Sequence, residues 1–428
     1  MMRSTELPRV LKNLGLSFDP ELGMFVNDLT KIPLSIYYDR ERGEVRAIDQ
    51  TRLPYELRVW KTGDWKEILA AIKRMVVRGA PLIGCAGAFA LALAAKELRK
   101  EEPDEMVASL ERVGRRIVEV RPTGVDVRNN VARIIAAAKR ALDGQLGSRG
   151  IAEEVERETL LIFVEGLVLA KALQENGVEF IEDGDVIMTH CNAGSLATPY
   201  GGSALGIMEE ALARSIEFLV IVKETRPRCQ GYKLTTWELL RAQASMIVVT
   251  DNTISSAMRG LKVTKVLVGA DRITRGGFVA NKIGTCDIAI ISSVYNIPFL
   301  VAAPYSTLDL GEWGGEIPIE ERDPSEITAF YSYEALSMKG RGLLSDDAFE
   351  GWPPKAVITS QDRPSPGKIR LYNPAFDVTP PDMVSRVILD IGVYRPDELR
   401  LLSQRTVKEE ARRVIDRYMA LLGAPRYP

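Results

Sequence analysis

A free thiol, Cys191, stands where a short apolar run ends in a turn of small residues. The run is Val186–Thr189, and Asn192-Ala193-Gly194 follow the thiol. Backbone N–H groups at a strand-to-helix turn of this kind suit a phosphate or an oxyanion. The alternative is a cysteine that only fills a buried turn, as most free cysteines do. Position alone leaves both interpretations of Cys191 open.

A carboxylate and a lysine occupy comparable positions further along the chain. Asp271 follows Val268-Gly269-Ala270 at the end of another apolar run, and Asn281-Lys282 come shortly after it. An Asp and a Lys that share a pocket with a thiol can move a proton and hold an anion. The alternative for Asp271 is the cap of a helix. We place Asn281-Lys282 at the start of a helix.

Two arginines lie in loops at predicted helix boundaries, within Arg78-Gly79-Ala80 and Arg121-Pro122-Thr123. A guanidinium suits bidentate contacts with phosphate, although a loop arginine also serves in surface ion pairs. The only histidine of the chain is His190. We expect it to pack beside the strand before Cys191 rather than to act as a base.

The elements that position these residues are five β-branched runs, each followed by polar residues and separated by helix-length segments. This alternation predicts βαβ units in a parallel sheet. Ligands bind such sheets beyond the carboxyl ends of the strands, where every polar cluster named above falls. The five runs are Val186–Thr189, Leu219–Val222, Met246–Val249, Val266–Val268 and Pro298–Val301.

The first third of the chain predicts a different architecture. Alternating residues in Tyr37–Trp60 indicate short antiparallel strands, and apolar periodicity then predicts successive helices. We therefore expect an α/β protein with a Rossmann-like parallel sheet domain at 147–428 and a smaller, mainly helical N-terminal domain at 1–146 with a small antiparallel sheet. Residues 322–371 are rich in Pro, Ser and Gly, which predicts an insertion. The predicted helices are Trp65–Val77, Ala86–Leu98, Pro103–Glu119, Val127–Ala141, Ile151–Gln174, Asp382–Leu389 and Val407–Leu422.

Composition narrows the class of protein. The 428 residues are 46% hydrophobic and 27% charged with a net charge of −2, so nothing favours nucleic acid or an anionic membrane as a partner. The most apolar stretch, Leu82–Ala95, is shorter than the ~20 residues of a membrane span, which predicts a buried helix. Met1–Leu14 lacks an apolar signal core, so we expect a cytoplasmic protein.

Cofactor signatures are missing from the sequence. The four cysteines, of which Cys85, Cys229 and Cys286 have no setting like that of Cys191, are far apart, so neither a metal site nor disulfides are expected. Neither GxGxxG after the first strand nor GxxxxGK[ST] occurs, so no nucleotide cofactor is expected. The residues alone predict an enzyme that acts on a small phosphorylated compound, and they do not name the reaction.

Several stretches together resemble the methylthioribose-1-phosphate isomerase family, in family order from about residue 47 to 392. The wider family includes ribose-1,5-bisphosphate isomerase and the regulatory subunits of the eukaryotic exchange factor for translation initiation, which are not enzymes. The matching motifs are Val77–Gly84, Arg121-Pro122-Thr123, Thr189–Gly194, Glu224-Thr225-Arg226-Pro227 with Gln230-Gly231, Gly269–Ile273, Asn281–Thr285 and Asn373–Pro380.

The resemblance implies an aldose–ketose isomerase that converts 5-methylthioribose 1-phosphate to 5-methylthioribulose 1-phosphate in methionine salvage. It makes Asp271 the acid at the ring oxygen and Cys191 the thiolate at C2. It also implies a small phosphorylated sugar as the substrate, no metal or other cofactor, and a homodimer. The residues that it assigns to substrate contact are Arg78, Gly79, Ala80, Arg121, Gln230, Asn281 and Lys282.

Departures from the family pattern leave alternatives open. Gly124–Val127 is less apolar than usual after Arg-Pro-Thr, and Pro199–Ser203 reorders the usual Tyr-Gly-Thr. Both bear on the substrate, so ribose 1,5-bisphosphate or another 5-substituted ribose 1-phosphate remains an alternative. A non-catalytic regulatory subunit is the alternative from another class. The retained pair Cys191 and Asp271 favours an enzyme, and His190–Gly194 favours the methylthioribose branch.

Overall fold

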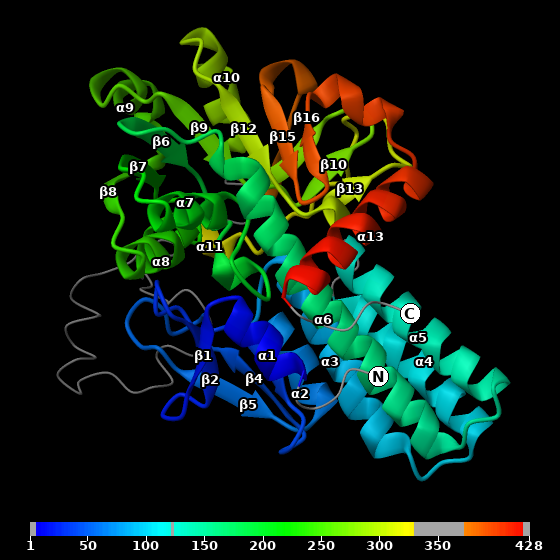
Figure 1. The fold of residues 1–428 in the computed structure, drawn as a ribbon. Coiled ribbons are helices and arrows are strands. Elements are labelled where there is room, and N and C mark those ends of the chain that lie inside the picture. The colour runs from blue at the N-terminus through cyan, green and yellow to red at the C-terminus, as the bar shows by residue number, and fades with distance from the viewer. Residues whose placement is uncertain (1–5, 121–123, 329–371, 423–428) are drawn as a thin grey trace, which may run out of the picture.

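A computed structural model describes residues 6–120, 124–328 and 372–422. Small antiparallel sheets and long helices form the N-terminal part, and a large, mostly parallel sheet forms the C-terminal part (Figure 1). The long helix α6 (Ser148–Val178) runs from one part toward the other, and the last helix, α13 (Gln404–Leu421), lies beside it. The predicted α/β fold class is confirmed.

The N-terminal extension packs on the first hydrophobic core. Val10 and Leu11 of its helix are fully buried there. The antiparallel strands predicted over Tyr37–Trp60 are present as a three-stranded sheet of order β3-β4-β5. The elements are α1 (Glu6–Asn13), the hairpin β1 (Leu16–Asp19) and β2 (Met24–Asn27), and the sheet β3 (Ile36–Asp39), β4 (Glu44–Ile48) and β5 (Val59–Thr62).

Four further helices complete this part. They are α2 (Trp65–Lys73), α3 (Ala80–Leu98), α4 (Pro103–Val120) and α5 (Val125–Asp143). Among the described residues α3 alone is long and apolar enough to cross a membrane, but 78% of its apolar window is buried inside the protein. It is the buried helix that the sequence predicted. Buried side chains of α6, as far as Ala172, belong to the same hydrophobic core as α3. The predicted division of the chain between residues 146 and 147 stays a prediction.

The large sheet has seven strands in the order β16-β15-β12-β9-β6-β7-β8, and only the β15–β16 pair is antiparallel. All five predicted parallel strands are present. The chain runs outward through β6, β7 and β8, returns to the other side of β6, and runs outward again through β9 and β12. This reversal opens a crevice between the carboxyl ends of β6 and β9. The strands are β6 (Asp185–Thr189), β7 (Phe218–Lys223), β8 (Ser245–Val249), β9 (Lys265–Val268), β12 (Phe299–Ala302), β15 (Arg386–Leu389) and β16 (Gly392–Tyr394).

Helices cover both faces of this sheet and form a hydrophobic core on each. One core contains α7 (Ala204–Ala213) and part of α8 (Thr236–Arg241), which continues a short π-helical turn, Gly231–Thr235. The other contains α9 (Ile254–Gly260), α10 (Thr285–Val294) and part of α13. The short helix α11 (Ser325–Thr328) lies outside both cores.

Two predictions about secondary structure were wrong. The second half of the predicted helix over Asp382–Leu389 is strand β15, because Val387 and Ile388 are fully buried between the two cores and pair in parallel with β12. Asn281-Lys282 do not begin a helix but lie on a strand of a second sheet of order β13-β10-β11-β14, and α10 begins only at Thr285. The strands of this sheet are β10 (Arg272–Thr274), β11 (Val279–Lys282), β13 (Leu308–Asp309) and β14 (Phe376–Thr379).

Two predicted segments fall largely or wholly outside the described residues. They are Arg121-Pro122-Thr123 and residues 329–371, which make up most of the predicted insertion at 322–371. The first part of the insertion, which includes α11, is described and lies against the rest of the protein through an ion pair of 2.6 Å between Arg228 and Glu326.

Burial of Asp390 predicts a dependence of stability on pH. Burial is the main cause that raises the pKa of its carboxyl from 3.8 to about 8. Between these values the folded chain binds one proton more than the unfolded chain, so this group's contribution to stability falls as the pH rises from about 4 to about 8. Asp390→Asn keeps an acceptor for the Tyr305 N–H and cannot ionise. We expect the variant to exceed the wild type in free energy of unfolding by more at pH 8 than at pH 5, measured by urea denaturation. A difference that is independent of pH would contradict the assignment.

Candidate functional site

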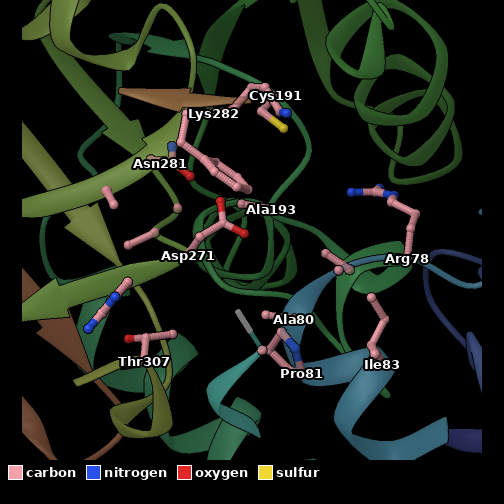
Figure 2. Close-up of a pocket in the computed structure, with 18 of the residues that line it drawn as sticks. Arg78, Ala80, Pro81, Ile83, Cys191, Ala193, Asp271, Asn281, Lys282 and Thr307 are labelled. Atoms are coloured by element: carbon pink, nitrogen blue, oxygen red, sulfur yellow. The ribbon is translucent and has the colours of Figure 1, made fainter. Parts of the chain in front are cut away.

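A cavity of about 370 Å³ lies at the crevice between β6 and β9, where the first part of the chain faces the large sheet. Figure 2 shows Cys191, Asp271 and Lys282 on one side of it and Arg78 on another. Eight of the nine predicted site residues line this cavity, and the ninth, Arg121, lies outside the described residues. The eight are Arg78, Gly79, Ala80, Cys191, Gln230, Asp271, Asn281 and Lys282.

Cys191 is held by its backbone and presents its side chain to the cavity. Its φ of +62° lies in the left-handed region, which residues other than glycine adopt uncommonly. Its N–H donates to the Thr225 hydroxyl at 2.8 Å, and its carbonyl accepts from the Thr235 hydroxyl at 2.6 Å. Figure 2 shows the sulfur directed into the cavity. Two threonines, one after β7 and one in the π-helical turn, therefore hold the backbone of Cys191 and fix the direction of its thiol.

The pKa of Cys191 is set by opposing influences. Burial is the largest and raises it above the usual value of 9, and Asp271 raises it further. The positive charges of Lys282 and Arg78 lower it. Burial outweighs them, so in the free protein the thiol form prevails at neutral pH.

Asp271, Asn281 and Lys282 come together because the loop after β9 pairs with β11. The N–H of Asp271 donates to the carbonyl of Ala280 at 3.0 Å, one residue before Asn281. The Lys282 ammonium donates to the Ala375 carbonyl at 2.9 Å. Burial lowers the pKa of Lys282, whereas Cys191 and Asp271 raise it. Strand β11 thus places the Asn281 amide and the Lys282 ammonium beside Asp271 and Cys191.

Arg78 reaches the cavity from the N-terminal part and is fastened at several atoms. Its Nε donates to Gln50 Oε1 at 2.9 Å, and its terminal nitrogens bond both the carbonyl and the side-chain oxygen of Asn192. Gly79, at a φ of +96°, packs so closely that a Cβ would lie 2.4 Å from the Ala197 carbonyl oxygen. Only glycine fits there, and it lets α3 begin at Ala80 with its N-terminus toward the cavity.

Gln230 offers an unused polar atom. It precedes the π-helical turn, is buried and lines the cavity. Among the described residues its Oε1 has no hydrogen-bond partner. Because a buried acceptor without a partner is costly, this oxygen is suited to a donor on a ligand.

His190 is buried beside β6, as predicted. Its Nε2 lies 2.9 Å from the Ile283 carbonyl, so Nε2 carries the proton. Burial, followed by Lys223, lowers its pKa to about 3. The imidazole is therefore neutral over the physiological range.

Sequence reasoning missed several polar residues of the cavity. Gln50 follows β4 and gave no signal of its own, because a single polar residue after a strand is common. Asp126 lies at the start of α5, in the stretch that departs from the family pattern, and that departure was the available signal. Further polar lining residues are Arg128, Thr198, Ser203, Arg228, Arg272, Ser306, Thr307, Asp309, Glu320 and Arg322.

The arrangement suits proton transfer beside an anion. Arg78 and Lys282 are cations that can hold a phosphate, and Asp271 and Cys191 are groups that can donate and accept protons. Within residues 6–120, 124–328 and 372–422, no group of three or more His, Cys, Asp or Glu side chains is placed to hold a metal ion.

The pKa shifts at the site predict how the thiol reacts. Alkylation of Cys191 by iodoacetamide should be slow at pH 7 and accelerate as the pH approaches and passes 9, because only the thiolate reacts. Lys282→Met removes a cation that lowers this pKa, so alkylation should be slower than in the wild type at each pH. Peptide mass spectrometry measures the rate at each cysteine. Cys286, whose pKa is raised by burial and nearby carboxylates without a contribution from Lys282, is the internal control. An unchanged or faster rate at Cys191 in the variant would refute this account.

Comparison with known proteins gives a consistent set of relatives. The profile described as "Initiation factor 2 subunit family" matches residues 76–396. A 5-deoxyribose 1-phosphate isomerase from Moorella thermoacetica is 39% identical over 83% of this chain and 92% of its own length. A methylthioribose-1-phosphate isomerase from Pelotomaculum thermopropionicum is 37% identical over 83% of this chain and 89% of its own length.

Solved structures share the fold over most of the chain. A 5-methylthioribose 1-phosphate isomerase from Pyrococcus horikoshii has a TM-score of 0.74 at 31% identity, covering 89% of this chain and 96% of its own. A translation initiation factor eIF-2B subunit delta from A. fulgidus has a TM-score of 0.70 at 34% identity, covering 87% of this chain and 99% of its own. Proteins named as isomerases and a protein named as a translation initiation factor subunit are thus both among the relatives.

Proposed function

We propose that this chain, which belongs to the initiation factor 2 subunit family, converts 5-methylthioribose 1-phosphate to 5-methylthioribulose 1-phosphate. Several of its relatives are named as isomerases, and the chain is an enzyme of that class. The observation that carries the proposal is the meeting of Cys191 and Asp271 in one cavity with two cations, Arg78 and Lys282. Each residue comes from a different segment, so the fold rather than local sequence brings them together.

The chemistry requires an acid and a base on one sugar. A phosphate on the anomeric carbon prevents free opening to an aldehyde. The Cys191 thiolate takes the C2 proton, and a C1=C2 double bond forms as the bond between C1 and the ring oxygen breaks. Asp271 donates a proton to that oxygen and then accepts the proton of the C2 hydroxyl as the ketone forms. Cys191 returns a proton to C1, which restores both groups.

The remaining residues hold the substrate. Arg78 and Lys282 are the phosphate contacts that we propose, with the N-terminus of α3 at Ala80 pointing the same way. The Gln230 side chain, which lines the cavity, contacts the sugar. Lys282 and Arg78 have a second task, because both lower the pKa of Cys191 and so raise the fraction of thiolate.

A non-catalytic regulatory subunit is the second candidate, and the A. fulgidus relative favours it. A subunit that only binds a partner has no need for a thiol and a carboxylate that face the same cavity. The enzyme accounts for that pair, and the subunit does not.

The proposal also covers the location, oligomeric state and cofactor requirement of the enzyme. We propose a cytoplasmic homodimer without a cofactor. Ile247 and Val248 on the edge strand β8 are 37% and 41% exposed, which supports an association of copies at that edge. Light scattering that gives the mass of a single chain would exclude the dimer.

Turnover assays distinguish the candidates. Purified protein should convert methylthioribose 1-phosphate to a ketose phosphate visible by NMR, in the presence of EDTA as well as without it. The 5-deoxy analogue and ribose 1,5-bisphosphate, tested in parallel, report on the 5-substituent. Faster turnover of the bisphosphate would replace the proposed substrate, and no turnover of any of the three would favour the regulatory subunit.

Substitutions at the acid and the base test their roles. Cys191→Ser and Asp271→Asn nearly conserve volume, so both variants should keep the wild-type melting temperature. General acid–base groups contribute about 10²–10⁴-fold in rate, and each variant should lose an amount in this range. Cys286→Ser is the matched control and should keep its activity. The serine variant should also fail to exchange solvent deuterium into the product, and near-normal turnover in it would remove Cys191 from the mechanism.

A further inference from the structure

A buried carboxylate stands behind the cavity without lining it. Glu238, on α8, is fully buried, and it contacts the loop that carries the thiol rather than the cavity itself. Its Oε1 accepts from the Asn192 side-chain amide at 2.7 Å and from the Leu196 N–H at 3.4 Å. Asn192 in turn accepts from Arg78 through its side-chain oxygen. A continuous chain of hydrogen bonds therefore runs from Glu238 through one amide to the guanidinium in the cavity.

The amide of Asn192 is oriented by this chain. An amide has one acceptor end and one donor end, and the two face opposite ways. The carboxylate of Glu238 accepts only, so it holds the NH₂ end, and the oxygen end is left for Arg78. The other bond of the NH₂ group, to the Thr235 hydroxyl, is long at 3.3 Å. Glu238 is the strong partner that sets the direction of the amide.

The charge and burial of Glu238 are consistent with its holding the Asn192 amide. Burial is the main cause that raises the pKa of Glu238 to about 7, and its bond with Asn192 and the charge of Arg78 oppose the rise. A neighbouring buried carboxyl, Glu209 on α7, has a pKa raised well above the usual value, by burial and then by Glu238. Burial and the proximity of the two carboxyls therefore oppose the ionisation of Glu209.

We propose that Glu238 is a positioning residue that holds the Arg78 guanidinium in place for an anion through the side chain of Asn192. This assignment rests on the proposed function only in taking Arg78 as a phosphate contact. Neither residue of the link moves a proton in the reaction. Without the link Arg78 keeps its charge, its bond to Gln50 and the 3.3 Å bond to the Asn192 carbonyl, but the side-chain oxygen that accepts from its other terminal nitrogen is no longer held in place.

The test compares two substitutions that remove the same charge. Glu238→Gln keeps an oxygen for the Asn192 amide, whereas Glu238→Met has similar volume and no acceptor. The probe is inorganic phosphate, measured by calorimetry at pH 8, where Glu238 is ionised in the wild type. In the Met variant the buried Asn192 amide is left without its acceptor, so we expect this variant to bind phosphate about tenfold more weakly than the Gln variant. Since both lack the charge, the difference isolates the bond.

A double-mutant cycle shows whether the effect passes through Arg78. In an Arg78→Ala background the Met and Gln variants should bind phosphate equally, because the group that Glu238 positions is missing. Glu209→Gln is the matched control: it alters a buried carboxyl of the same pair and should leave phosphate affinity unchanged. If Glu238→Met does not fold, Asn192→Ala breaks the same link and should weaken binding similarly.

Three results would overturn the proposal. They are equal affinities of the Met and Gln variants with Arg78 present, a difference that persists without Arg78, and a wild type that does not bind phosphate. The readout needs no turnover, so an inactive protein whose phosphate affinity follows Glu238 would contradict the proposed reaction and not this assignment. With an active protein, the same order of variants should appear in kcat/KM.

Discussion

The reversal of strand order at β6 is the constraint on which the rest of the structure depends. Where successive parallel strands are added in the same direction along a sheet, their connecting segments lie on the same face of the sheet and cover the carboxyl ends of the strands. Where β9 returns to the other side of β6, the connections part and the ends of both strands stay open. Cys191 follows the first strand and Asp271 follows the second. The acid and the thiol therefore face the same crevice although they are far apart in the sequence.

Burial in this crevice disfavours the charged forms of its ionisable side chains. Burial lowers the pKa of both cations at the cavity, Arg78 and Lys282. An arginine starts from so high a value that it stays charged, whereas a buried lysine needs anions close by. The groups whose ionised forms raise the pKa of Lys282 are Cys191, Asp271 and then Glu326, and the first two are the groups proposed to react. The arginine is consequently the fixed charge of the site, and the lysine is coupled to its chemistry.

The strands around the crevice could be predicted from the sequence, and parts of the frame could not. Buried parallel strands appear in a sequence as continuous runs of β-branched residues, and all five predicted runs are strands of the large sheet. The run that forms β15 follows two prolines, and a short apolar run fits a buried helix equally well. β11 pairs Asn281 with Asp377, a partner that no local pattern indicates.

For the site, spacing alone left Cys191 undecided, and the family resemblance selected the residues that the cavity then brings together. Gln50 was missed because its function depends on contacts with Arg78 and with the Leu196 carbonyl, both remote in sequence. Its role, like those of the other site residues, stays a prediction.

Close packing ties the loop of Cys191 to both parts of the chain and limits where this protein can differ from its relatives. A Cβ at Gly79 would meet the backbone of Ala197, and one at Gly194 would lie within 2.3 Å of Glu238. A loop with so little free space cannot adapt to different sugars. The walls of the cavity can, and Asp126, in a stretch that departs from the family pattern, lies on one of them. On the proposed function, we therefore expect the walls to choose among 5-substituents and the loop to serve the chemistry that these substrates share.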